Sequence, residues 1–334
     1  MSSETQQLVL QTADRLFQEL AAAPAQEFSE GWARLEEAGF SGLLVPEEEG
    51  GFGGSFADAA AVLRLAGFHG QPAPLGETII ARFLLHGAGR HSGAGLLTLA
   101  PRCAGHIDAA RFTGRLEAVP FGNEAETIVA ALDGRLLALA RRAASSVRPS
   151  LHCAGEPRAT LVFEDAPVEL AASKVELFAL GAFARSCAMA GALDAALARS
   201  VEYANTRVQF AKPIAKFQAV QQSLAVFAEE AAAVNCAAQA AAQALDRGEA
   251  RFEVACAKLR ANMAAQIGVA TAHQVHGAIG FTAEFGLHHL TGRLIAWSSE
   301  FGNLRYWAER AGALAAQWGA EGLWAEITRR GDEA

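Results

Sequence analysis

The sequence has few of the features that mark membrane-spanning, exported or nucleic-acid-binding chains. Its 28 lysine and arginine residues are outnumbered by 36 aspartate and glutamate residues, which gives a formal net charge of −8. No basic stripe offsets this balance, so a surface for the phosphate backbone is not expected. No run of about 18 residues is free of polar side chains, and the start MSSETQQLVL lacks a basic segment followed by an apolar one. We therefore expect a cytoplasmic protein with no membrane span and no nucleic-acid partner.

Cysteine and histidine patterns that hold metals are also missing. The five cysteines are scattered without a CxxC pair, and three of them lie among alanines. Such an odd, dispersed set suits reduced thiols that act as small core residues rather than nucleophiles. His288 and His289 are adjacent, and neighbours on a helix point about 100° apart, so they are expected at a surface or interface. No metal site is predicted.

What the sequence does have is apolar residues, alanine above all. The chain of 334 residues is 51% hydrophobic and 19% charged, with runs such as AAAVNCAAQAAAQAL. Alanine with leucine, glutamate and glutamine favours helix over strand. This length exceeds the usual single core, so two or three subdomains are expected. The composition predicts a mainly helical, well-packed protein.

Residues 1–96 are predicted to form an N-terminal helical domain. Its helical patterns are interrupted by the segment LLVPEEEGGFGG, after which Ser55 and Asp58 resemble a capping box that opens a helix. The segment has neither the GxxxxGK[ST] nor the GxGxxG order, and its acidic residues would repel phosphate. We interpret it as a turn between helices rather than a phosphate cradle.

Residues 97–171 are predicted to form a small β domain, because short apolar runs there alternate with glycine, proline and acidic turns. Asp133-Gly134 between two such runs indicates a hairpin. Residues 172–334 return to long helical patterns and are predicted to form a four-helix bundle, long enough for an oligomer interface. One of its helices carries an apolar stripe: Phe217, Val220, Leu224 and Phe227. A second is predicted to end at Gly277.

Two stretches of this bundle carry candidate binding residues. YANTRVQFAKPIAKFQAVQQSLA, residues 203–225, sets an arginine, an aromatic and two lysines around a helix start at Pro213. Free N–H groups and the dipole at a helix start favour an anion, although a solvated start explains the same residues equally well. In HQVHGAIGFTAEFGLHHLTGR, Gln274 offers an amide, and Gly277 and Gly280 allow close backbone approach to a ligand.

Together these stretches resemble the acyl-CoA dehydrogenase family. The family segment R-x-Q-F-G-K-P-I-x-x-F-Q-A-V-Q is matched from Arg207 to Gln221, with Ala211 in a glycine position, and Q-x-x-G-G-x-G-F is matched from Gln274 to Phe281, with Ala278 in another. GFSGLLVPEEEGGFGG resembles a third family loop. The resemblance spans nearly the whole chain. It implies a helical N-terminal domain, a middle β domain and a C-terminal four-helix bundle.

The resemblance also implies FAD as cofactor and a set of residues that hold it. Arg207 would pair with the diphosphate, Gln209 and Phe210 would line its path, and Gln274 with the Gly277–Gly280 backbone would hold the ADP part. Gln218, which also matches the motif, joins this set. A diphosphate suits a guanidinium, and an approaching backbone suits glycine. In the family these groups reach the FAD of a neighbouring subunit, so an oligomer is implied, either a homo-oligomer or a heterotetramer with a longer acyl-CoA dehydrogenase subunit.

The family reaction removes the α-proton of an acyl-CoA thioester with a carboxylate while the β-hydride passes to the flavin. Many members carry this carboxylate in an EGT stretch, with which Glu300 aligns. Others place it in an earlier helix, which here corresponds to the neighbourhood of residues 181–185, where no acidic residue stands. Glu300 is therefore the candidate base, and apolar surroundings are expected to raise its basicity. Trp297, Trp307, Trp318 and Trp324 are expected to pack between helices rather than to line an acyl pocket.

Two departures from the family pattern shape the functional hypotheses. Phe301-Gly302-Asn303 follows Glu300 in place of Gly-Thr-Ser, and the middle region lacks the T-E-P-x-x-G-S-D stretch that meets the flavin ring. The chain thus resembles the short subunits of heterotetrameric acyl-CoA dehydrogenases from bacterial steroid side-chain breakdown. It is expected to be either a dehydrogenase subunit acting on a bulky acyl-CoA or a non-catalytic subunit that completes a longer partner's FAD site. A flavin-dependent oxidase or monooxygenase of the same fold is a third possibility.

Overall fold

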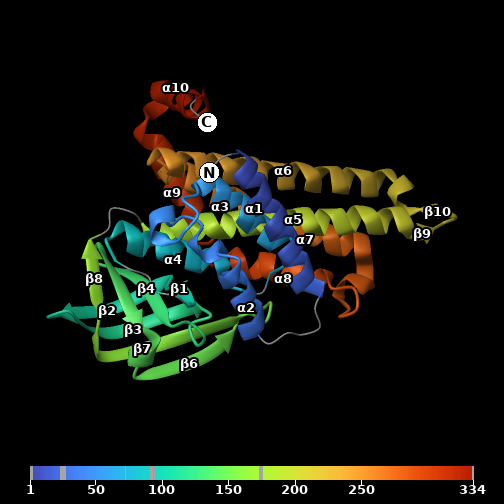
Figure 1. Ribbon diagram of the computed structural model, residues 1–334. Helices are drawn as coiled ribbons and strands as arrows, with labels where there is room; N and C mark the ends of the chain where they lie inside the picture. The colour runs from blue at the N-terminus through green and yellow to red at the C-terminus, as the bar shows by residue number, and fades with distance from the viewer. Residues whose placement is uncertain are drawn as a thin grey trace. The chain divides into compact units, whose positions relative to one another are not determined.

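The computed structural model describes residues 3–22, 28–71, 73–90, 93, 95–172 and 176–332. Helices predominate among them (Figure 1). The helices are α1 (Ser3–Ala22), α2 (Phe28–Glu37), α3 (Phe56–Phe68), α4 (Leu75–Gly87), α5 (Leu177–Thr206), α6 (Gln218–Arg247), α7 (Arg251–His276), α8 (Leu287–Trp297), α9 (Leu304–Gln317) and α10 (Gly319–Asp332). The strands are β1 (Leu97–Leu99), β2 (Arg102–Asp108), β3 (Arg111–Pro120), β4 (Thr127–Leu132), β5 (Arg135–Ala140), β6 (Ser146–Leu151), β7 (Pro157–Pro167), β8 (Glu169–Ala172), β9 (Val208–Gln209) and β10 (Lys212–Pro213). The predicted fold, mainly helical with a small β region, is confirmed.

The described residues divide into two compact units. The first unit comprises the described residues within 1–11, 22–59 and 72–184, and the second those within 12–21, 60–71 and 185–334. The first unit thus joins α2 and α4 to the β strands. The division into 1–96, 97–171 and 172–334 stays a prediction.

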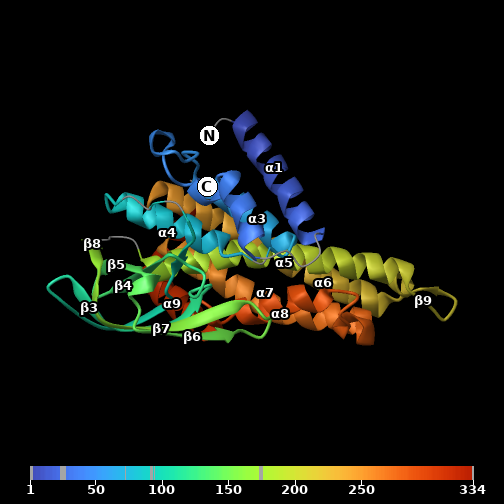
Figure 2. The same ribbon diagram turned by 60° about the horizontal axis from the view of Figure 1, so that its bottom comes forward.

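The strands of the first unit form two four-stranded sheets, in the orders β1-β4-β5-β8 and β2-β3-β7-β6. Figure 2 labels β4, β5 and β8 in one sheet and β3, β7 and β6 in the other. Neighbouring strands pair antiparallel, except that β1 runs parallel to β4. Apolar side chains from both sheets meet in one buried cluster that includes Phe112, Leu116, Leu139, Leu161 and Phe163. The sheets therefore share a single core.

Both local signals that the sequence gives for this unit are confirmed. The Ser55 backbone N–H donates to Asp58 Oδ2 at 2.8 Å, and the Asp58 N–H donates to Ser55 Oγ at 3.2 Å, which is a capping box at the start of α3. Asp133 and Gly134 have φ of 50° and 74° and join β4 to β5, where Leu132 pairs with Arg135. Positive φ at both turn residues is the hairpin geometry that Asp-Gly favours.

The second unit is a helical assembly around α5, α6, α7 and α8. Its buried cluster is built largely of alanine with a few large side chains, such as Leu193, Phe227, Val234, Leu290 and Trp297. The stripe predicted on α6 is fully buried only at Phe227, whereas Phe217, Val220 and Leu224 are half-buried. The outer end of that stripe is thus available to line a pocket.

Two glycines bring α3 and α5 unusually close within this unit. A Cβ added to Gly67 would lie 1.9 Å from the Ala188 carbonyl oxygen, and a Cβ added to Gly191 would lie 1.8 Å from the Arg64 carbonyl oxygen. Both distances are far inside van der Waals contact. The crossing therefore requires a residue without a side chain on each helix.

Helix α5 is long and apolar enough to cross a membrane by length and composition, with a mean hydropathy of 1.3 over its most apolar 18-residue window. However, 83% of that window is buried inside the structure. Burial of this extent is typical of a core helix in a globular protein, which also passes such a test.

Candidate functional site

The first candidate site lies at the end of α5 and the start of α6, where β9 and β10 form a short hairpin (Figure 1). Lys212 pairs with Gln209 and Pro213 with Val208. The two turn residues, Phe210 and Ala211, have φ of 51° and 63°. Positive φ favours glycine, and the family has glycine at the position of Ala211. The backbone of Ala211 thus adopts the conformation that the family's glycine suits. The Phe210 side chain is 86% exposed.

A pocket of about 700 Å³ lies beside this hairpin. Its lining residues come from the hairpin, from α6 and from the end of α7: Gln209, Phe210, Ile214, Phe217, Ala219, Val220, Ser223, Gln274 and Val275. Three of the predicted cofactor residues, Gln209, Phe210 and Gln274, are thus brought together from distant parts of the chain. The volume falls in the range of small-molecule sites.

The remaining predicted cofactor residues lie close to this pocket in the chain but do not line it. The guanidinium of Arg207 is exposed and has no carboxylate partner among the residues that the structure describes. Gln218 is the first residue of α6 and is exposed. The predicted helix start at Pro213 is wrong, because Pro213 pairs with Val208 in the hairpin and a 3₁₀ turn, Ile214–Lys216, precedes α6.

Gly277 and Gly280 meet two different backbone requirements at the end of α7. Gly277 has φ 62° and ψ −143°, a conformation that other residues rarely adopt. At Gly280 an added Cβ would lie 3.0 Å from the Cβ of His276 and 3.2 Å from Leu287 Cδ2. Helix α7 ends at His276, as predicted from Gly277. The glycines shape the turn beside Gln274.

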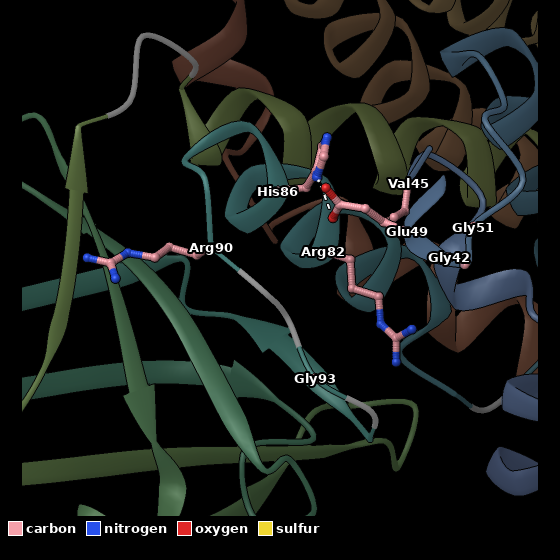
Figure 3. A pocket seen from close by; sticks show the side chains of 9 residues that line it. Gly42, Val45, Glu49, Gly51, Arg82, His86, Arg90 and Gly93 are labelled. Atoms are coloured by element: carbon pink, nitrogen blue, oxygen red, sulfur yellow. Dashed lines mark hydrogen bonds and ion pairs between the residues drawn. The ribbon is translucent and has the colours of Figure 1, made fainter. Parts of the chain in front are cut away.

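The glycine-rich segment of the first unit contains no phosphate cradle. The N–H groups of Gly50, Gly51, Gly53 and Gly54 all donate to backbone carbonyls of residues 43–47, at 2.8 to 3.0 Å. A pocket of about 80 Å³ borders the segment, where Figure 3 shows His86 facing Glu49, 2.9 Å away, and Arg90 pointing elsewhere. This volume suits a few water molecules rather than a nucleotide. The interpretation as a turn between helices is confirmed.

The second candidate site is the turn that follows α8 and carries Glu300. The Glu300 carboxylate accepts a hydrogen bond from Arg185 Nε at 2.8 Å, and the two side chains are only 15% and 10% exposed. The Arg185 guanidinium also lies over the Trp297 ring, 5.4 Å from its centroid. The expectation of apolar surroundings is therefore wrong at this contact, because a charged guanidinium touches the carboxylate.

Lys258 on α7 is the feature of this site that sequence reasoning missed. Its side chain is fully buried, and its ammonium donates to Asn262 Oδ1 at 2.7 Å, to the Trp297 carbonyl at 2.9 Å and to the Gly302 carbonyl at 3.3 Å. Burial lowers the pKa of Lys258 to about 7, an effect that nearby Glu300 opposes and Arg185 reinforces. The turn therefore contains a buried charge network.

The sequence did hold a signal for Arg185, which sequence reasoning also missed. Arg185 is the only charged residue between Leu177 and Leu193. A lone charge in an apolar stretch is rarely buried without a partner. Lys258 gives no such signal, because α7 also carries Arg251, Glu253 and Arg260.

The backbone around Glu300 is held by the residues that replace the family's Gly-Thr-Ser. Phe301 has φ 48° and is buried. At Gly302, φ is 100° and an added Cβ would lie 2.3 Å from Trp307 Nε1. The Trp307 N–H donates to the Phe301 carbonyl at 2.8 Å, and Asn303 Oδ1 caps α9 by accepting from the Tyr306 N–H at 2.9 Å. Contacts within the turn and with the start of α9 thus contribute to its shape.

Tryptophan packing between helices was predicted and is confirmed for three of the four residues. Trp297 and Trp307 are buried, and Trp318 contacts Phe252 with ring centroids 4.7 Å apart. The prediction is wrong for Trp324, which is 77% exposed on α10.

The histidines give no sign of a metal site in the part of the chain that the structure describes. No group of three or more His, Cys, Asp or Glu side chains there could hold a metal ion. The ring centroids of His288 and His289 lie 4.0 Å apart. Burial and the neighbouring His288 lower the pKa of His289.

Known proteins match the chain in both sequence and fold. The profile described as "Acyl-CoA dehydrogenase, N-terminal domain" matches residues 3–76, and that described as "Acyl-CoA dehydrogenase, C-terminal domain" matches residues 172–296. Acyl-CoA dehydrogenase IpdE2 of Mycobacterium tuberculosis is 31% identical over 271 residues, which cover 80% of this chain and 81% of that protein. Both profile matches leave out the β region and the Glu300 turn.

Two solved structures share the fold. A chain of a variant of the Tcur3481-Tcur3483 steroid ACAD superposes with a TM-score of 0.88 at 21% identity, over 96% of this chain and 100% of that one. A chain of the ChsE4-ChsE5 complex from Mycobacterium tuberculosis superposes with a TM-score of 0.83 at 23% identity, over 95% of this chain and 98% of that one. The folds agree over nearly the full length of each chain. With the matched profiles and the IpdE2 similarity, this establishes that the chain belongs to the acyl-CoA dehydrogenase family.

Proposed function

We propose that the chain is one subunit of a heteromeric, FAD-dependent acyl-CoA dehydrogenase that desaturates a bulky, steroid-derived acyl-CoA between its α and β carbons. The observation that carries this proposal is the pocket between the β9–β10 hairpin and the end of α7. It gathers Gln209, Phe210 and Gln274, which stand in the family's two FAD motifs. A cytoplasmic location would suit this activity.

The residues at this pocket fit the ADP end of FAD. A volume of about 700 Å³ accommodates an adenosine-sized group, and Phe210 and Phe217 offer aromatic faces. The exposed Arg207 would pair with the diphosphate, and Gln218 at the first turn of α6 would add an amide donor. Gly277 and Gly280 would keep side chains away from the approaching nucleotide. When bound, FAD supplies the acceptor for the β-hydride.

A heteromeric assembly is supported by two of the similar structures, whose names pair two unlike chains, and by what this chain lacks. The superposition with this chain covers 100% of the matched Tcur3481-Tcur3483 chain and 98% of the matched ChsE4-ChsE5 chain. The middle region of this chain has no T-E-P-x-x-G-S-D stretch to meet a flavin ring. A longer partner subunit would supply that stretch, so each FAD would be held by two unlike chains.

Glu300 is the candidate base of this chain. Its carboxylate would accept the α-proton of the thioester, which requires that the contact with Arg185 opens or turns so that one oxygen faces the substrate. The Arg185–Glu300 ion pair favours a second candidate function, in which this chain is non-catalytic and the partner supplies the base. In that case Glu300 and Arg185 neutralise each other and act only in packing.

Substitution of Glu300 separates the two candidates. In the flavin-loaded assembly, Glu300→Gln is expected to slow flavin bleaching by acyl-CoA by roughly 100- to 10,000-fold while FAD stays bound, because a general base contributes that much. Glu309→Gln, which changes an exposed carboxylate on α9, is the matched control. Equal bleaching rates in both variants would assign the base to the partner.

A further inference from the structure

The ammonium of Lys258 is surrounded by hydrogen-bond acceptors. Its three neighbours are all acceptors: Asn262 Oδ1 at 2.7 Å, the Trp297 carbonyl at 2.9 Å and the Gly302 carbonyl at 3.3 Å. An ammonium has three N–H donors and no acceptor, so it matches this set one for one. The side chain is fully buried, and no solvent can replace these bonds.

The two carbonyls lie at opposite ends of the turn that carries Glu300. Trp297 is the last residue of α8, and its carbonyl is one of the terminal groups that have no partner within the helix. Gly302 immediately precedes Asn303, the residue that caps α9. A positive charge at a helix C-terminus is also favourable to the helix dipole. One side chain of α7 therefore joins the end of α8 to the start of α9.

Asn262 completes this arrangement from the next turn of α7. Its Oδ1 accepts from Lys258, and its Nδ2 donates to the Gly302 carbonyl at 3.3 Å. Lys258 and Asn262 are four residues apart and so lie on the same face of the helix. The Gly302 carbonyl is thus held by two donors from α7.

We propose that Lys258 is a positioning residue that sets the Trp297–Asn303 turn, and with it the place of the Glu300 carboxylate beside Arg185. The ammonium acts on Glu300 through the two ends of the turn, whose carbonyls it holds, in addition to the charge interaction between the two groups. The effect on the turn does not depend on catalysis, whereas a catalytic consequence rests on the proposed function of Glu300.

Amide hydrogen exchange of the full chain tests this role. Lys258→Met keeps a long buried side chain and removes the ammonium, and it is expected to speed exchange of the amides of residues 298–303 about tenfold or more, because the turn opens locally. Val234→Ala on α6, a buried truncation in the same unit, is the control for lost stability. Equal turn exchange in the two variants, compared at matched global stability, would overturn the proposal.

Two further measurements keep the outcomes distinct. Lys258→Ala leaves room for a small amine, so added ethylammonium is expected to restore slow exchange in the turn. Rescue by an equal concentration of sodium would contradict the role of the ammonium.

In the flavin-loaded assembly, Lys258→Met is expected to slow flavin bleaching, with an unchanged acyl-CoA concentration for half-saturation, if Glu300 is the base. If Glu300→Gln bleaches normally, the proposed base fails, while the exchange result still decides the role of Lys258.

Discussion

The buried ammonium of Lys258 predicts a specific dependence of stability on pH. Its pKa is about 10.5 in an unfolded chain and about 7 in the fold, where burial disfavours the charge. Below pH 7 both states bind the proton, and the cost of burying the charge is fully present. Between these two pKa values the unfolded state binds a proton that the folded state does not, so stability increases as pH rises.

The size of this effect follows from the two pKa values. Their difference corresponds to roughly 5 kcal/mol in total, with a slope near 1.4 kcal/mol per pH unit. From pH 7 to pH 9 the wild type should therefore gain roughly 2 kcal/mol relative to Lys258→Met. Lys258 is fully buried, so solvent screening does not reduce the value.

Urea unfolding of wild type and Lys258→Met at several pH values measures this difference directly. Subtraction removes the contribution of the titrating groups that do not interact with Lys258. Lys216→Met, which removes an exposed lysine, is the matched control measured over the same pH range. A difference between wild type and Lys258→Met that does not change with pH would refute the reasoning, because it would mean that Lys258 titrates alike in the folded and unfolded chain.

Two further predictions concern the flavin site and the helix packing. Arg207→Met should weaken FAD binding to the assembly about 10- to 100-fold, which is the range for loss of a charge-assisted hydrogen bond. The control variant Lys216→Met should change FAD affinity little. Equal losses of affinity in a flavin titration of the two variants would show that Arg207 does not bind FAD. Gly191→Ala should destabilise the chain by about 2 kcal/mol or more, because its Cβ would lie 1.8 Å from the Arg64 carbonyl oxygen. Gly312→Ala on α9 should instead stabilise the chain by up to about 1 kcal/mol, because nothing lies within 4 Å of the added Cβ. If thermal unfolding shows an equal loss of stability in both variants, the close crossing of α3 and α5 is not the cause.

The features that the sequence predicted correctly depend on short spacings. The Ser55–Asp58 capping box involves residues three apart, and the Asp133-Gly134 hairpin is set by two residues in the turn itself. The end of α7 was predicted because Gly277 takes a backbone conformation that favours glycine. Each of these signals is complete within a few residues.

The start of α6 shows how a local rule can fail. Proline at a helix start is common, and Pro213 suggested one. The pairing of Pro213 with Val208 instead places it in a hairpin, and α6 begins at Gln218. Nothing in the local spacing distinguishes these two uses of proline.

The charge network around Glu300 could not be predicted for a different reason. Arg185 meets Glu300 from 115 residues away, and Lys258 reaches Trp297 and Gly302 from 39 and 44 residues away. Composition shows that Arg185 is unusual in an apolar stretch, but the partners of both residues depend on how the helices pack. The resemblance located Glu300 and not the guanidinium that holds it.

The FAD content of purified protein tests the central claim most directly. The chain should be purified alone and after co-expression with a longer acyl-CoA dehydrogenase homologue, and the FAD released from each preparation should be counted per chain. The account predicts a colourless chain alone and, with the partner, a stable complex that holds fewer FAD molecules than chains. A yellow chain that binds one FAD per subunit without a partner would contradict it.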